Sequence, residues 1–221
     1  MDSSAITLTS PFYLLIPLAL MSLIPFIAVV GTSFLKLVVV FSILRNATGL
    51  QQIPPNIAMN ALAIILTLYV MAPVGFRAYE TLSTMDTQFD INDPDWIEAV
   101  SAAARPYKEF LLKNTHKRER DFFYKTASVL WPEEDKKDLD REDFIILVPA
   151  FCISELTRAF QIGFLLYLPF IVIDLIVSNI LLAMGMMMVS PMTISLPFKL
   201  LLFVMLDGWT RLTHNLVLSY G

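Results

Sequence analysis

The chain has 221 residues, of which 56% are apolar and only 16% are charged, against roughly 25% charged residues in an ordinary globular domain. This balance predicts a protein that lies in a membrane, or one that is first inserted into a membrane. A formal net charge of -4 and a pI near 5.1 argue against nucleic-acid binding, which requires a basic surface.

The charged residues divide the sequence into three parts. Residues 80–143 hold 26 of the 36 Asp, Glu, Lys and Arg residues, 16 of them acidic and 10 basic. This polar insert separates an N-terminal apolar arm, residues 1–79, from a C-terminal apolar arm, residues 144–221. The pattern predicts an all-α protein in which two membrane-type helical hairpins are joined by a polar, mainly helical insert.

The N-terminal arm contains two uncharged runs, residues 3–35 and 46–76. Each exceeds the roughly 20 residues that a helix needs to cross a bilayer core. Between them, residues 45–49 and 54–56 carry the Gly and Pro residues that are typical of a turn. The arm is therefore predicted to be a helical hairpin. Residues 1–4 lack the basic stretch of a secretory signal, so we expect the first apolar segment to be retained.

Arg45 at the tip of this hairpin indicates the topology. By the positive-inside rule the tip is expected on the cytoplasmic side, which puts both termini and the insert on the outer side of the membrane.

The insert is expected to be helical. Residues 96–105 follow the sequence NDPD at 92–95, which has the pattern of a helix N-cap with acids in the first turn. A second stretch, residues 106–125, places Tyr107, Phe110 and Leu111 on one side. The charged residues 133–138 are interpreted as a solvated connection.

The C-terminal arm fits a bilayer less well. Only fifteen residues, 159–173, separate Arg158 from Asp174, which is roughly 22 Å of helix against a hydrocarbon core of about 30 Å. Prolines and ionisable groups at membrane depth are tolerated where neighbouring helices or a cavity satisfy them. We therefore expect much of this arm to pack against protein.

Several charged residues lie in or beside the apolar segments, where an unpaired charge costs a few kcal/mol or more. They are Lys36, Glu155, Arg158, Asp174, Lys199 and Asp207. Our preferred hypothesis is that Glu155 of one copy pairs with Lys199 of another and holds the copies together. Pairing within the chain, or snorkelling of these side chains to the membrane interface, is given equal weight.

A methionine cluster near the end of the chain is the most unusual local feature. It consists of Met184, Gly185, Met186, Met187 and Met188, inside a run without charge from 175 to 198. Core filling is the ordinary interpretation, because Met packs irregular gaps. Gly185 and the nearby Pro191 favour instead a broken helix whose loop lines a cavity.

No catalytic or metal-binding motif is found. Cys152 is the only cysteine, which excludes an intrachain disulfide, and His116 and His214 stand alone without ligand spacing. The sequence contains no G-x-S-x-G, phosphate-binding Gly-rich loop or H-E-x-x-H. We therefore expect no enzyme activity, no metal and no cofactor.

Both arms carry motifs of a known family. In the first half these are GTSFLK at 31–36, LRNA at 44–47 with Gly49, and QQIPPN at 51–56. In the second half they are EL at 155–156, AFQIGF at 159–164, LPF at 168–170, Asp174, MGMMM at 184–188, ISLPFK at 194–199 and DGW at 207–209. The chain resembles the R subunit of the bacterial type III secretion export apparatus (SctR/FliP family), in its virulence injectisome branch. Thr48 departs from the leucine expected there.

The resemblance implies a core component of the export gate. Several copies, an expected pentamer, would form a cone-shaped pore with the small hydrophobic S and T subunits, at the periplasmic face of the bacterial inner membrane within the secretion basal body. Unfolded effector and needle or inner rod proteins would pass through it, and residues 184–188 would act as its gasket. The switch/autoprotease U and large V subunits are further implied partners.

Two alternatives stay open at this point. One is a secondary transporter or ion-channel subunit that uses Lys36, Asp174 and Lys199 as intramembrane charges for a small solute. Such a protein would have internal repeats, and no convincing repeat relates the two arms. The other is a structural scaffold in which the methionines only fill space.

Overall fold

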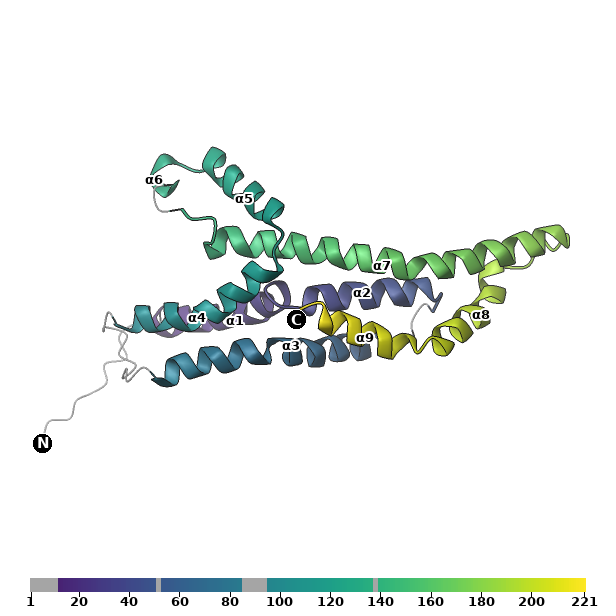
Figure 1. Cartoon of the computed structure of the whole chain (residues 1–221), viewed down its shortest axis with the longest axis horizontal. Coiled ribbons are helices and arrows are strands. Elements are labelled where there is room, and N and C mark those ends of the chain that lie inside the picture. The colour runs from purple at the N-terminus through teal and green to yellow at the C-terminus, as the bar shows by residue number, and fades with distance from the viewer. Residues whose placement is uncertain (1–11, 51–52, 85–94, 137–138) are drawn as a thin grey trace, which may run out of the picture.

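The computed structural model describes residues 12–50, 53–84, 95–136 and 139–221, and all regular elements in these ranges are α-helices. The expected all-α class is therefore confirmed. In chain order the helices are α1 (Phe12–Val30), α2 (Phe34–Ala47), α3 (Asn56–Thr84), α4 (Asp95–Asn114), α5 (Lys117–Leu130), α6 (Glu133–Lys136), α7 (Phe144–Ala183), α8 (Pro191–Met205) and α9 (Gly208–Leu218). They form an elongated molecule along which α7 runs for much of the length (Figure 1).

The membrane character of the two arms is also confirmed. The helices α3 and α7 are each long and apolar enough to cross a membrane, and so are two bent pairs, Met21–Val30 with Phe34–Ala47 and Pro191–Met205 with Gly208–Leu218. The described part of the chain thus offers two to four candidate spans.

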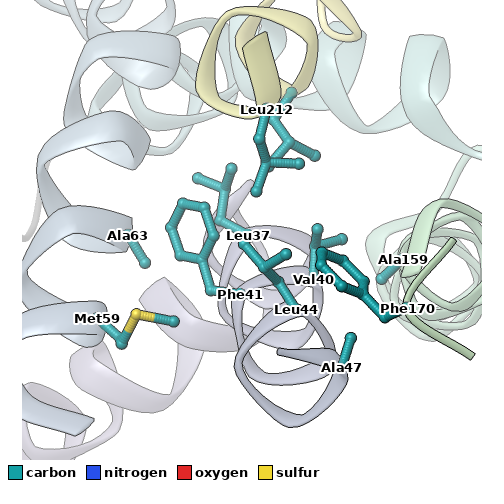
Figure 2. Packing of buried hydrophobic residues seen from close by; sticks show 11 residues of the cluster. Leu37, Val40, Phe41, Leu44, Ala47, Met59, Ala63, Ala159, Phe170 and Leu212 are labelled. Carbon is teal, nitrogen blue, oxygen red and sulfur yellow. The ribbon is translucent and has the colours of Figure 1, made fainter. Parts of the chain in front are cut away.

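Helix α2 lies at the centre of the main core. Its buried side chains Leu37, Val40, Phe41 and Leu44 recur at three- and four-residue intervals, which places them along one stripe of the helix. Figure 2 shows this stripe between residues of α3 on one side and of α7 on the other, with a residue of α9 above it. Because α2 is enclosed from several directions, its position determines how the two arms meet.

The first apolar run differs from the prediction, because it does not form one continuous helix. It breaks at residues 31–33, where the axis bends by 58° between Met21–Val30 and Phe34–Ala47. The Thr32 hydroxyl donates to the Ala28 carbonyl and accepts from the Phe34 N–H at 3.3 Å, which provides a partner for a free backbone donor at the start of α2. The predicted turn after α2 is confirmed by Gly49, whose φ of 78° is left-handed.

The third apolar segment is not limited to fifteen residues. Helix α7 continues through Arg158 and Asp174 for 40 residues, or about 60 Å, because both charged side chains have partners within the chain. It also contains Pro149 and Pro169. A charged residue in an apolar run therefore did not mark a helix end here.

The insert is helical in its described part but divides differently from the prediction. Helix α4 runs through Pro106 to Asn114 and stops at residues 115–116, where the His116 N–H donates to the Ser154 hydroxyl of α7 at 3.0 Å. Helix α4 packs against α3 and α7, and α5 packs against α7. Residues 92–94 of the cap predicted at 92–95 lie outside the described residues. The predicted connection begins with the short helix α6 (Figure 1).

A glycine contact between α2 and α7 gives a first testable prediction. A methyl group at Gly163 would lie 2.4 Å from Ile43 Cδ1 and 3.1 Å from Ile43 Cβ, and a β-branched side chain in a helix cannot turn away freely. We expect Gly163→Ala to lower the free energy of unfolding of the detergent-purified protein by about 1–3 kcal/mol.

The matched control is Gly75→Ala, also inside a helix, where a methyl group meets nothing within 4 Å. This change should be neutral or slightly stabilising, because alanine is the better helix former. Equal unfolding curves for the two variants would contradict the close α2–α7 contact.

Candidate functional site

The methionine cluster lies in a turn between α7 and α8. We call residues 184–190 the methionine loop. Helix α7 ends in a Schellman motif, in which the Gly185 N–H donates to the Leu182 carbonyl at 3.0 Å and the Met186 N–H donates to the Leu181 carbonyl at 2.9 Å. Gly185 takes the left-handed φ of 74° that this motif requires, and α8 begins with Pro191 at its first turn. The broken helix expected from Gly185 and Pro191 is present.

The methionine side chains are not part of a core in the single chain. Met188 is 100% exposed and Met187 80% exposed, while Met184 and Met186 are also exposed. The loop forms one end of the elongated molecule, far from the core around α2 (Figure 1). Flexible thioether side chains at such a tip provide an apolar surface that adapts to different partners.

A buried ion pair joins α2 to α7 at the middle of the molecule. Lys36 Nζ lies 3.6 Å from Glu155 Oε2, and the two side chains are 1% and 0% exposed. Removing two charges from water costs several kcal/mol per ion, so further polar partners are needed. Lys36 donates to the Ser219 hydroxyl at 2.8 Å, and its ammonium lies 3.5 Å from the centre of the Tyr220 ring.

Tyr220 completes this pair from the segment that follows α9. Its hydroxyl donates to Glu155 Oε2 and lies 3.5 Å from the Ser33 carbonyl oxygen. Burial raises the pKa of the Tyr220 hydroxyl well above its ordinary value, and the charge of Glu155 adds to the increase. The hydroxyl therefore keeps the proton that it donates to the carboxylate.

Arg158 connects the same carboxylate to the insert. Its guanidinium donates to Glu155 Oε1 at 3.2 Å and to the backbone carbonyl of Asn114 at 3.0 Å. Asn114 is the last residue of α4, where backbone carbonyls lack helical partners and the helix dipole favours a cation. The residues Lys36, Glu155, Arg158, Ser219 and Tyr220 are called the central network below.

A second charge network lies further along α7, toward the methionine loop. Lys199 of α8 pairs with Asp174 of α7 at 2.7 Å and also donates to the carbonyl of Ala47, the last residue of α2, at 3.2 Å. The Ser195 hydroxyl donates to the other Asp174 oxygen at 2.6 Å. The return helix α8 is thus attached to both α7 and α2.

The charged residues predicted from the sequence differ in how deeply they are buried. Lys36, Glu155 and Lys199 are buried, whereas Arg158 and Asp174 are partly exposed. Asp207, which the sequence places in or beside an apolar segment, is not buried in the single chain. Asp207 is exposed at the break between α8 and α9, with a left-handed φ of 50°.

The predicted contact between Glu155 of one copy and Lys199 of another stays a prediction. Within the single chain Glu155 is paired with Lys36 and Arg158, and Lys199 is paired with Asp174.

Sequence reasoning missed Ser195 and Tyr220. Ser195 lies four residues before Lys199 and therefore on the same helix face, a signal that was available in the sequence. Nothing in the sequence marks Tyr220, because its partners lie in α2, α4 and α7. Across the described ranges no group of three His, Cys, Asp or Glu side chains could hold a metal ion.

Fold and site together define a helical membrane-type protein. Two charge networks connect its apolar arms, and the methionine loop lies exposed at one end. Comparison with known proteins gives the family: the FliP family matches residues 17–216, and the chain belongs to it. The resemblance seen in the sequence motifs is therefore confirmed.

Relatives of similar length are found in several bacteria. The chain is 57% identical to the Yop proteins translocation protein R of Yersinia pestis, over 98% of this chain and 99% of that protein. It is 50% identical to the virulence protein YscR of Salmonella typhimurium, over 96% and 98%. It is 48% identical to the hypersensitivity response secretion protein HrcR of Ralstonia nicotianae, over 90% and 92%.

The buried Lys36–Glu155 pair leads to the second prediction. Lys36→Met leaves Glu155 with one cation fewer in the interior, and we expect it to lower the free energy of unfolding by about 3–5 kcal/mol. Adding Glu155→Gln to the same chain should restore part of this loss, because no uncompensated carboxylate then remains beside position 36. Denaturant unfolding in detergent is measured for the parent, for Lys36→Met, for Glu155→Gln and for the double variant, which together form a double-mutant cycle.

Lys136→Met is the control, because Lys136 pairs with Glu133 on the surface of α6. An exposed pair contributes roughly 0–1 kcal/mol, so this variant should unfold almost as the parent does. A loss at Lys36 no larger than the loss at Lys136 would contradict the buried pair.

Proposed function

We propose that this chain is a core subunit of a type III secretion export gate. With further copies it forms the pore through which unfolded effector and needle or rod proteins cross at the level of the inner membrane. The single observation that carries this proposal is its membership of the FliP family, together with relatives named for translocation and secretion over nearly the whole chain.

The methionine loop is the proposed gasket of this pore. Its support is geometric: a turn closed by a Schellman motif displays exposed thioethers at one end of the molecule, in a stretch without charge from 175 to 198. Unbranched thioether chains fill irregular gaps and have little geometric preference. Several such loops around an axis would close on ions and still admit an unfolded chain of any sequence.

Assembly with other apolar chains is supported by the surfaces that the single chain leaves uncovered. Large apolar side chains are exposed along α7 and α8, among them Phe160, Phe164, Leu175, Phe198 and Leu201. We propose a pentamer extended by the small hydrophobic S and T subunits. The U and V subunits would lie beside it, and the complex would stand at the periplasmic face of the bacterial inner membrane.

We propose a conduit without catalytic activity, whose driving force is supplied by associated components. The charges that a solute transporter would use are already occupied: Lys36 pairs with Glu155, and Lys199 pairs with Asp174. These pairs favour the conduit over the transporter.

The third prediction concerns the gasket. Replacing Met186, Met187 and Met188 by alanine shortens three side chains at the loop and should leave the pore leaky. We expect a several-fold rise in ion conductance of membranes that contain the assembled complex, with secretion altered. Replacement by leucine should have a smaller effect, because it keeps the apolar volume and loses only the thioether flexibility.

The control carries alanine at Met21, Met192 and Met205, three exposed methionines outside the loop. Conductance is compared per assembled complex, so that a defect in assembly is not counted as a leak. Parent-like ion conductance and normal secretion in the loop variant would contradict the gasket hypothesis and favour a scaffold.

The fourth prediction concerns assembly. The protein purified in mild detergent with its co-expressed genomic neighbours should give a closed multimer with several copies of this chain and additional small hydrophobic subunits. Native mass spectrometry and electron microscopy measure composition and shape. A stable monomer or dimer that recruits no such subunits would contradict the export-gate hypothesis and favour the transporter hypothesis.

A further inference from the structure

We propose that the polar insert acts as a clamp on the C-terminal arm. One face of α4 carries Tyr107, Phe110 and Asn114, and Phe110 of this face supports Tyr220 over the buried Lys36–Glu155 pair. The insert thereby fixes α9. This inference concerns how the chain holds itself together, and it is independent of the pore proposed above.

The three residues of the clamp lie on one face of α4, because their spacing of three and four residues follows the helical repeat. Each contacts a different part of the apolar arms. The Tyr107 hydroxyl donates to the Gly31 carbonyl at 2.9 Å, at the break between α1 and α2. The Asn114 carbonyl accepts from Arg158 at 3.0 Å, and the Phe110 ring stacks on Tyr220 with their centres 6.0 Å apart.

The contact at Gly31 requires a glycine. A methyl group there would lie 2.1 Å from the Tyr107 hydroxyl oxygen, so only a residue without Cβ allows this approach. Burial raises the pKa of Tyr107 to about 12, which keeps the hydroxyl protonated as the donor. The insert is therefore fitted to the bend in the first apolar run as well as to the network behind it.

Phe110 is the residue that joins the insert to Tyr220. It lies 5.7 Å from Phe151 of α7 between ring centres and, partly buried itself, packs against the small core of Leu111, Leu147 and Phe151. A phenylalanine packed in this way loses apolar contacts if it moves away from the core. It therefore supports the Tyr220 ring against the Lys36 ammonium.

Tyr220 in turn limits the movement of α9. It follows α9 by two residues, and its hydroxyl contacts Glu155, which lies on α7. If Tyr220 loses Phe110, its ring loses one of its supports. The attachment of the end of α9 to the central network then rests on the remaining contacts of Ser219 and Tyr220 with Lys36 and Glu155 and is weakened. Opening of α9 should therefore depend on a residue of the insert.

Hydrogen exchange of the full chain in detergent or nanodiscs tests this coupling. The readout is the exchange rate of the backbone amides of residues 208–218, compared among Phe110→Ala, Tyr220→Ala and the double variant. We expect each single change to raise this rate about tenfold, and the double change to raise it no further than the larger single effect. The control is Phe122→Ala, which removes an exposed phenylalanine of the same insert and should leave α9 as in the parent.

Conservative variants keep the test decisive if alanine at position 110 prevents folding. Phe110→Leu keeps an apolar side chain in the small core and removes the stacked ring, and it should raise exchange in α9 in the same direction by a smaller factor. Tyr220→Phe keeps the ring and removes the hydroxyl bond to Glu155. Parent-like exchange of α9 in the position 110 variants, or factors that multiply in the double variant, would overturn the clamp.

Discussion

The burial of Lys36 against Glu155 is the constraint on which the rest of the structure depends. An ion pair whose side chains are 1% and 0% exposed is tolerated only if its geometry and its remaining hydrogen bonds are satisfied. That requirement brings together four distant parts of the chain: α2, α7, the end of α4 and the segment after α9. With α2 fixed in this way, α3, α7 and α9 pack around its apolar stripe (Figure 2).

The two charge networks share one design. In each, a carboxylate of α7 pairs with a cation, and that cation also binds the last carbonyl of another helix: Arg158 binds Asn114 at the end of α4, and Lys199 binds Ala47 at the end of α2. A cation is favoured there because the final carbonyls of a helix are unpaired and carry the negative end of its dipole. Charges in the apolar arms thus fix where two helices end.

The sequence was sufficient for the features that local chemistry determines. The helical class, the turn after α2 and the loop at Gly185 and Pro191 were predicted, because composition, glycine and proline act within a few residues. The partner of each charge could not be predicted, since Glu155 and Lys36 are separated by about half of the sequence. The bend at residues 31–33 and the passage of α4 through Pro106 were missed for the same reason. The bend is set by the contact of Gly31 with Tyr107, and the course of α4 is set by its packing on α3 and α7.

Pro169, one of the two prolines inside α7, marks a point at which this helix can bend. Pro169 lacks the backbone donor that a helix interior needs, and it stands fifteen residues before Met184, or about 22 Å along the axis. A change of roughly 10° in the bend at this point would carry the tip sideways by about 4 Å, close to the width of a side chain. The central network, whose α7 residues Glu155 and Arg158 precede Pro169, would stay closed during such a bend, whereas Asp174 follows Pro169 and would move with the tip relative to Ala47 of α2.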